Sequence, residues 1–253
     1  MNSNSEERNA RGWDVLAPRY QSERGWPCDD LCWGHRVPKE RELRALGDVA
    51  GKRTLVLGCG GGQDLVAMAR LGATGLVGVD LSTAQLEHAR TLLDERGVVA
   101  RLERRSVADL SIFADQSFDL VVSVHALSYV EHAEACFREA RRVLRPGGVL
   151  GIGVHHPIDA STGGEPPYGF TKPYFQVETD WAWRSLGGEA APFRSYHRTV
   201  ADWFTLVSEA GLSVEKLLEP RPSEDIVWES VDYKEKLAWV PGTLIVVARR
   251  PML

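Results

Sequence analysis

The chain has 253 residues, of which 43% are hydrophobic and 26% charged, which is ordinary for a soluble α/β domain with insertions. No apolar stretch approaches the roughly 20 residues of a membrane-spanning helix, and the polar segment 1–10 lacks the apolar core of a signal peptide. We therefore expect a cytoplasmic protein with no membrane partner. Residues 1–10 are predicted to form a disordered tail and residues 11–253 a single domain.

The net charge of −5 argues against nucleic acid as a partner, because nucleic-acid binders usually carry a basic face. The densest basic run, between Arg138 and Arg145, falls near the end of a predicted helix, where cations stabilise the helix dipole. Four cysteines are present. With no export signal, we expect these thiols to be reduced. Cys28 and Cys32 lie four residues apart, but no second Cys/His pair follows at metal-ligand spacing, so we expect no metal site.

Between Thr54 and Gly153, short apolar runs alternate with helical stretches. Near-continuous apolar strands that alternate with helices are typical of a parallel sheet covered on both faces. The pattern predicts a Rossmann-like α/β fold with a seven-stranded, mostly parallel sheet. Predicted strands cover residues 54–57, 75–79, 101–106 (near an edge), 118–124, 149–154, 212–218 and 244–248, and predicted helices cover 63–70, 82–96 and 132–144. The second helix starts at a capping box of Ser82 and Gln85, and Thr199 with Asp202 caps a later helix.

A glycine-rich turn joins the first strand to the first helix in residues 55–64, LVLGCGGGQD. Glycines there permit positive φ and the close approach of a ligand. A dinucleotide fold needs glycine at the first, third and sixth positions, but the sixth is Gln63, which disfavours an NAD-linked oxidoreductase. No Gly-Lys-Ser/Thr follows, so the turn is not a P-loop. The spacing of Gly58, Gly60 and Gly62 resembles that of class I methyltransferases that use S-adenosylmethionine (SAM), especially the ubiquinone and menaquinone biosynthesis type.

The resemblance continues in the same order over residues 54–154 and implies roles for further residues. Asp80 ends the second strand, where an acidic side chain can accept both hydroxyls of a ribose. By resemblance, Asp80 holds the SAM ribose, Asp109 contacts the adenine amino group, Ala108 lines the base, and Tyr20 caps the SAM carboxylate. The resemblance also places Leu81, Gln85 and Val124 against the cofactor.

One departure from the family concerns Val56. The family often has Asp or Glu at this position, two residues before the first glycine, facing the SAM ammonium group. Here either a backbone carbonyl replaces that contact or SAM binding is weaker.

The loop-rich, aromatic segment 155–197 follows the fifth strand and therefore leaves the sheet at its ligand-binding edge. We predict that this segment is an inserted lid over a mainly apolar or aromatic acceptor, with a short hairpin over residues 171–183. The alternative is that its aromatic side chains form a small satellite core. Candidate acceptor-binding residues are Tyr129, Tyr168, Tyr174 and Trp181.

Four histidines are candidate general bases, because histidine titrates near neutral pH. His125 follows the fourth strand, His155 and His156 end the fifth, and His197 precedes a capped helix. The alternative for each is a hydrogen-bonded loop residue. Residues 165–168, Glu-Pro-Pro-Tyr, resemble a motif of adenine N-methyltransferases but lie beyond the fifth strand, so we interpret them as a rigid turn.

The sequence therefore predicts SAM-dependent methyl transfer to a small molecule, with the accepting atom, O, N or C, left open. The alternative is a SAM-binding protein of the same fold with a non-methylating role, such as a natural-product cyclase or isomerase.

Overall fold

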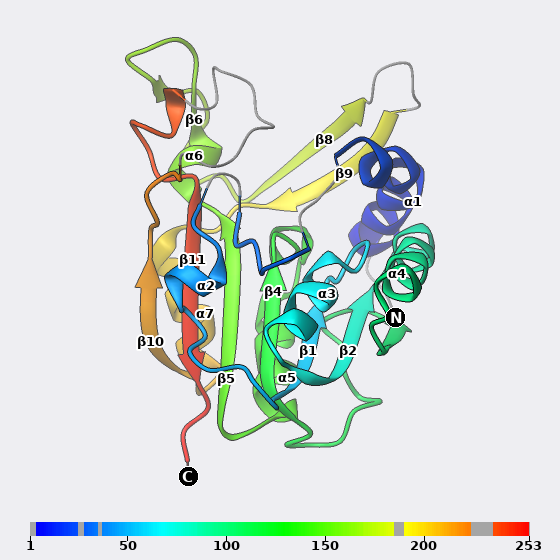
Figure 1. The fold of residues 1–253 in the computed structure, drawn as a ribbon. Coiled ribbons are helices and arrows are strands. Elements are labelled where there is room, and N and C mark those ends of the chain that lie inside the picture. The colour runs from blue at the N-terminus through cyan, green and yellow to red at the C-terminus, as the bar shows by residue number, and fades with distance from the viewer. Residues whose placement is uncertain (1–3, 25–27, 35–36, 185–189, 224–234, 253) are drawn as a thin grey trace.

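The computed structural model of the chain describes residues 4–24, 28–34, 37–184, 190–223 and 235–252. A seven-stranded sheet in the order β10-β11-β5-β4-β1-β2-β3 forms its centre (Figure 1). Strands β1 to β5 pair in parallel, and β11 runs antiparallel to both β5 and β10, which confirms the predicted, mostly parallel sheet. The strands are β1 Arg53–Leu57, β2 Thr74–Asp80, β3 Ala100–Arg104, β4 Phe118–Val124, β5 Leu144–His155, β10 Ser213–Leu218 and β11 Thr243–Arg249.

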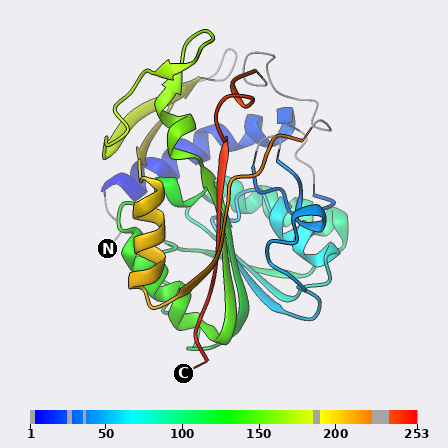
Figure 2. The same ribbon diagram turned by 90° about the vertical axis from the view of Figure 1, so that its left-hand side faces the viewer.

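Helices cover both faces of the sheet, as predicted. One face packs against α3 (Gln63–Arg70), α4 (Thr83–Arg96) and the segment that carries Trp33 and the short helix α2 (Glu40–Leu43). The other face packs against α5 (Ala133–Val143) and α7 (Val200–Glu209). In Figure 2, α7 lies on one side of β11 and the cyan helices lie on the other. Among the described residues no helix is both long and apolar enough to cross a bilayer.

The strand order reverses between β1 and β4, whose neighbours β2 and β5 lead in opposite directions. In open α/β sheets, ligands bind outside the carboxyl ends of the strands at such a reversal. Ser82 caps α4 by accepting a hydrogen bond from the Gln85 backbone N–H (3.1 Å). Within the described part of the chain, the Gln85 side chain does not bond back to Ser82. It instead accepts from Gln21 (2.7 Å), so only half of the predicted capping box forms.

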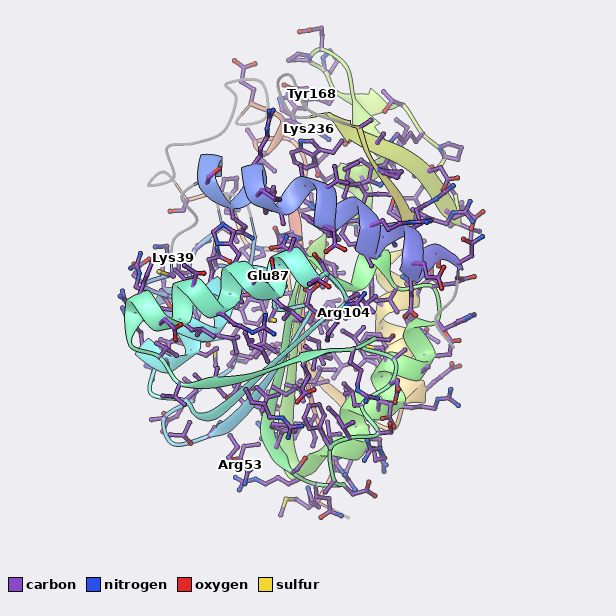
Figure 3. All side chains as sticks on the ribbon, turned by 90° about the vertical axis from the view of Figure 1, so that its right-hand side faces the viewer. Lys39, Arg53, Glu87, Arg104, Tyr168 and Lys236 are labelled. Atoms are coloured by element: carbon purple, nitrogen blue, oxygen red, sulfur yellow. The ribbon has the colours of Figure 1, made fainter. Side chains whose placement is uncertain are left out.

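Helix α1 (Asn4–Arg24) lies over this edge of the sheet and packs against α4 and β9 (Ala190–Tyr196), as Figure 3 shows for α4. The predicted disordered tail over residues 1–10 is therefore wrong from Asn4 onward. Ser5 and Asn9 are buried, and the Asn9 side-chain amide bridges to backbone atoms of Tyr129 and Arg194 (2.8–3.1 Å). These partners are distant in sequence, so tertiary packing orders a segment whose local composition is polar.

The segment after β5 contains a hairpin, but not at the predicted residues 171–183. The hairpin pairs β8 (Glu178–Arg184) with β9. Pro173 within the predicted range has no N–H to donate to a ladder, whereas residues 178–184 alternate beside a matching strand. The other elements of this region are α6 Pro157–Ser161, β6 Thr162–Gly163 and β7 Gly169–Phe170, and η1 Leu127–Tyr129 follows β4.

Candidate functional site

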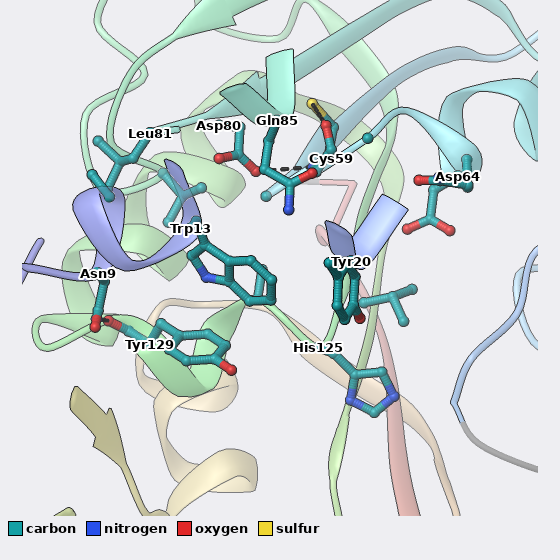
Figure 4. Close-up of a pocket in the computed structure, with 18 of the residues that line it drawn as sticks. Asn9, Trp13, Tyr20, Cys59, Asp64, Asp80, Leu81, Gln85, His125 and Tyr129 are labelled. Atoms are coloured by element: carbon teal, nitrogen blue, oxygen red, sulfur yellow. Dashed lines mark hydrogen bonds between the residues drawn. The ribbon is translucent and has the colours of Figure 1, made fainter. Parts of the chain in front are cut away.

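A cavity opens at the carboxyl ends of β1, β2 and β4, beneath α1 (Figure 4). Its empty space, including the open mouth, is about 1260 Å³. The walls come from the glycine-rich turn, the end of β2, the segment from Val124 to Val130, one face of α1 and the loop at Cys32 and Gly34. The predicted cofactor residues that line it are Tyr20, Gly58, Gly60, Asp80, Leu81, Gln85 and Val124.

The glycines of the turn have different tasks. A Cβ on Gly58, whose φ is 67°, would lie 2.2 Å from the Ala126 Cβ, so no other residue fits there. Gly60 lines the cavity and donates its N–H to Asp80. Gly62 does not line the cavity. It starts α3 at φ 88° and packs closely on Ala89 of α4, where a Cβ would be 3.1 Å away.

Asp80 ends β2 with its carboxylate held by two backbone donors. Oδ2 accepts from Gly60 N (2.9 Å) and Oδ1 accepts from Ser82 N (2.9 Å). Burial raises the pKa of Asp80, and these bonds oppose the rise. A carboxylate has about four acceptor positions. The two that remain on Asp80 suit a pair of hydroxyls.

Asp109 and Ala108 do not line this cavity. Asp109 lines a neighbouring pocket that shares Ala10 and Leu81 with it, so the adenine roles implied by the resemblance stay predictions. The Asp109 side chain is exposed and pairs with Arg105 (2.7 Å). Hydrogen bonds from Ser111 and the nearby Arg105 lower the pKa of Asp109. The cavity wall here is formed by Val107 and by Glu6 of α1, whose carboxylate accepts a hydrogen bond from the Ser106 hydroxyl.

An aromatic wall formed by Trp13, Tyr20 and Tyr129 closes the cavity on the α1 side. The Trp13 ring meets Tyr20 and Tyr129 edge-on, at centroid distances of 5.4 and 5.7 Å. Burial raises the pKa of Tyr129. Gln21 of the same helix bonds to Gln85 (2.7 Å) and accepts from Gln63 (2.6 Å), which ties α1 to the start of α4 and of α3.

Of the four candidate histidines, His125 lines the cavity. Its backbone is left-handed, with φ 54°, and its N–H donates to the Gly153 carbonyl (2.8 Å). The His125 ring lies 4.3 Å from the ring of the exposed His155, tilted by 33°.

His156 and His197, two of the predicted general bases, do not line the cavity. His156 is fully buried, and its Nδ1 accepts from Ile158 N (3.2 Å) at the start of α6. Its Nε2 therefore carries the proton that bonds to Glu219 Oε1, 2.7 Å away. His197 packs edge-on against Tyr174 outside the cavity, and burial lowers its pKa.

Most of the predicted acceptor-binding aromatics also lie elsewhere. Tyr129 lines the cavity, whereas Tyr168 packs on Trp239 at 6.2 Å, near Lys236 in Figure 3. Tyr174 lines a shallow groove on the surface, and Trp181 packs behind the wall on Phe193 at 4.9 Å. Within the described ranges, no residue of segment 155–197 lines the cavity. Helix α1, and not segment 155–197, therefore covers the cavity, and the β8–β9 hairpin packs against α1.

The sequence analysis assigned no cavity role to the lining residues Glu6, Trp13, Gln21 and Asp64. Three of them share one face of α1, because 6, 13 and 21 are separated by about two helical turns each. That spacing becomes a signal only when the position of the sheet edge is known. Val56, by contrast, is fully buried in the core and offers nothing to the cavity.

Comparison with known proteins agrees with this architecture. A family model described as a methyltransferase domain matches residues 55–152. The solved structure of an S-adenosylmethionine dependent methyltransferase from Mesorhizobium loti is 28% identical, covers 83% of this chain and 96% of that chain, and superposes with a TM-score of 0.66. These matches support the class I SAM-dependent methyltransferase superfamily for this chain. Its cofactor is SAM.

Two other similar proteins are named for different activities, one a methyl transfer and the other a cyclisation. The ubiquinone biosynthesis O-methyltransferase of Xanthomonas oryzae pv. oryzae is 39% identical over 103 residues, which are 41% of this chain and 43% of the relative. The shared part is thus less than half of that enzyme. The [4+2]-cyclase SpnF is 19% identical with a TM-score of 0.68, covering 100% of this chain and 98% of the cyclase, a likeness of fold alone.

Proposed function

We propose that this protein transfers the methyl group of SAM to a small, mainly apolar or aromatic acceptor that shares the cavity with the cofactor. The observation that carries the proposal is the make-up of that cavity. It joins a ribose-type carboxylate, Asp80, to a wall of aromatic rings and to His125.

The residues divide the work of binding. Asp80 accepts the two ribose hydroxyls, and Leu81 and Val107 cover the base. Gly58 and Gly60 bring the backbone close to the methionine part, near Tyr20. Trp13 and Tyr129 supply apolar faces for the acceptor.

When bound, SAM supplies an electrophilic methyl group on a positively charged sulfur. The protein's main task is then to hold the acceptor atom in line with that methyl in a water-poor space, which is worth several kcal/mol. Helix α1 excludes water from above, anchored by Asn9 and Gln21. His125 takes the acceptor's proton where the accepting atom carries one.

The acceptor is a small molecule and not a nucleic acid. Glu6, Asp64 and Asp80 contribute carboxylates to the lining, and the described lining residues include no Lys or Arg. Phosphate groups would be repelled by such a wall, whereas nucleic-acid sites attract them with cations.

The proposal is tested by incubating the protein with SAM and a panel of phenols, catechols, aromatic amines and oligonucleotides. We expect S-adenosylhomocysteine and a product heavier by one methyl group, both read by mass spectrometry, with small aromatic acceptors only. A product of unchanged mass without S-adenosylhomocysteine would instead support the cyclase or isomerase role. Methylated oligonucleotide would contradict the small-molecule assignment.

Glu6, and not Asp109, is expected to hold the adenine amino group. Glu6→Ala should weaken S-adenosylhomocysteine binding about tenfold, because a hydrogen bond to a charged group is worth about 1.5–3 kcal/mol. The same variant should lose the wild-type preference for S-adenosylhomocysteine over S-inosylhomocysteine, in which a carbonyl replaces the amino group. Calorimetry measures both affinities.

Asp109→Ala is the matched control, since its side chain is exposed and lies outside the cavity. It should bind both ligands as the wild type does. If Asp109→Ala loses the preference and Glu6→Ala keeps it, the adenine contact belongs to Asp109 after all.

A further inference from the structure

Asp64 lines the cavity with a carboxylate that has no role in the proposed function so far. It is the second residue of α3, and Figure 4 shows it beside the glycine-rich turn, across Cys59 from Asp80. Among the described residues its side chain makes no hydrogen bond or ion pair, although the group is deep enough that burial raises its pKa to about 7. The side chain is partly buried at the cavity wall. A ligand that covers it would leave an unpaired buried carboxylate, which is costly unless that ligand brings a cation.

The other two carboxylates of the cavity already have partners. Glu6 accepts from the Ser106 hydroxyl, and Asp80 accepts from the backbone of Gly60 and Ser82. With no Lys or Arg among the described lining residues, the cavity favours a positively charged ligand. Asp64 is the carboxylate left to pair with its charge.

The position of Asp64 also resolves the departure at Val56. The Val56 side chain is buried in the core between the sheet and its helices, so the end of β1 offers no acidic group. Asp64 stands seven residues after the end of β1, past the turn, and faces the cavity from the start of α3. Asp80 binds the ribose on the other side of the turn, which leaves the amino-acid end of the cofactor for the Asp64 side.

We propose that the Asp64 carboxylate is the counter-ion of the α-ammonium group of bound SAM. The inference rests on the proposed placement of SAM in this cavity, but not on the transfer of its methyl group. It makes cofactor affinity depend on the charge of one side chain.

Other titratable groups surround Asp64. Cys32 and Cys59 are close enough to feel the charge of Asp64, and burial raises the pKa of both thiols, so neither gains charge near neutral pH. Asp80 and His125 line the same cavity. Because histidine ordinarily titrates near 6.5, a variant without the Asp64 charge is needed to separate the two contributions.

The test is calorimetry with two ligands that share the nucleoside. S-adenosylhomocysteine carries the ammonium group, and 5′-methylthioadenosine lacks the whole amino-acid part. Asp64→Asn should weaken S-adenosylhomocysteine binding at least about tenfold and leave 5′-methylthioadenosine within about twofold of wild type. Asparagine is nearly isosteric, and unchanged binding of the nucleoside shows that the variant is folded.

The pH dependence of S-adenosylhomocysteine affinity provides a second test. The ammonium ligand prefers the ionised carboxylate, so lowering the pH from about 8 to about 6 should weaken S-adenosylhomocysteine binding by about tenfold in the wild type. The affinity for 5′-methylthioadenosine should stay constant, and Asp64→Asn should remove the dependence.

Each of the other possible results contradicts a specific part of the proposal. An equal loss for both ligands makes Asp64 a structural residue of the turn. Weaker binding of SAM with unchanged S-adenosylhomocysteine affinity assigns Asp64 to the sulfonium instead. Wild-type protein that binds neither ligand removes the cofactor placement itself, and with it the proposed function, whereas absent methyl transfer with intact binding leaves this inference standing.

Discussion

Replacing Asp80 with alanine is expected to weaken the binding of S-adenosylhomocysteine and of 5′-methylthioadenosine alike, at least about tenfold and up to about a hundredfold. The carboxylate is proposed to accept both ribose hydroxyls, and hydrogen bonds to a charged group contribute about 1.5–3 kcal/mol each. It also holds Gly60 N at 2.9 Å, so its loss loosens the turn that approaches the cofactor. Calorimetry on both ligands measures the effect.

The paired response distinguishes the two carboxylates on either side of Cys59. Asp80→Ala should affect both ligands because both contain the ribose, whereas Asp64→Asn should affect only the ligand with an ammonium group. Asp80→Asn keeps the volume and one acceptor oxygen and serves if the alanine variant does not fold. Unchanged affinity in both Asp80 variants would place the ribose elsewhere in the cavity.

The sheet was predictable because its determinants are local. The apolar runs of β1, β2 and β4 are fully covered by helices, so the core requirement appears directly as continuous hydrophobic sequence. The site at the end of these strands follows from the topology, since the carboxyl ends of parallel strands meet at one edge. Gly58 and Asp80 line the cavity for that reason.

Helix α1 was not predictable from its start, because its order depends on distant partners. Ser5 bonds to Glu131 (2.6 Å), and Asp14 accepts from Ser82 Oγ (2.7 Å). A polar segment of this kind has little apolar surface of its own to bury. Its helical spacing of cavity residues carries meaning only once the position of the sheet edge is known.

The direction of side chains in the loop after β3 was not predictable for a related reason. Asp109 has the residue type and the approximate position of an adenine contact, but spacing alone does not give the direction in which a loop side chain points. Here Arg105 and Ser111 hold it outward. The carboxylate that faces the cavity comes from Glu6, roughly a hundred residues earlier in the chain.

Replacing His125 with asparagine is expected to reduce methyl transfer about 10²- to 10⁴-fold, the usual contribution of a positioned general base. Asparagine is chosen because it tolerates the left-handed backbone of this position, φ 54°, better than alanine does. S-adenosylhomocysteine affinity should remain within about twofold, since the ring acts on the acceptor and not on the nucleoside. Turnover as a function of pH should lose its histidine-like limb in the variant.

Variants of the two neighbouring histidines distinguish a catalytic effect from a structural one. His155→Asn removes an exposed ring stacked at 4.3 Å on His125 and should lower turnover only modestly, through the orientation of that ring. His156→Asn should lower the melting temperature instead, because it breaks the bond from the buried His156 ring to Glu219 and the N-cap of α6. If His125→Asn leaves turnover and its pH profile unchanged, the accepting atom needs no base. His125 then only shapes the cavity, and position in the water-poor space under α1 accounts for the catalysis.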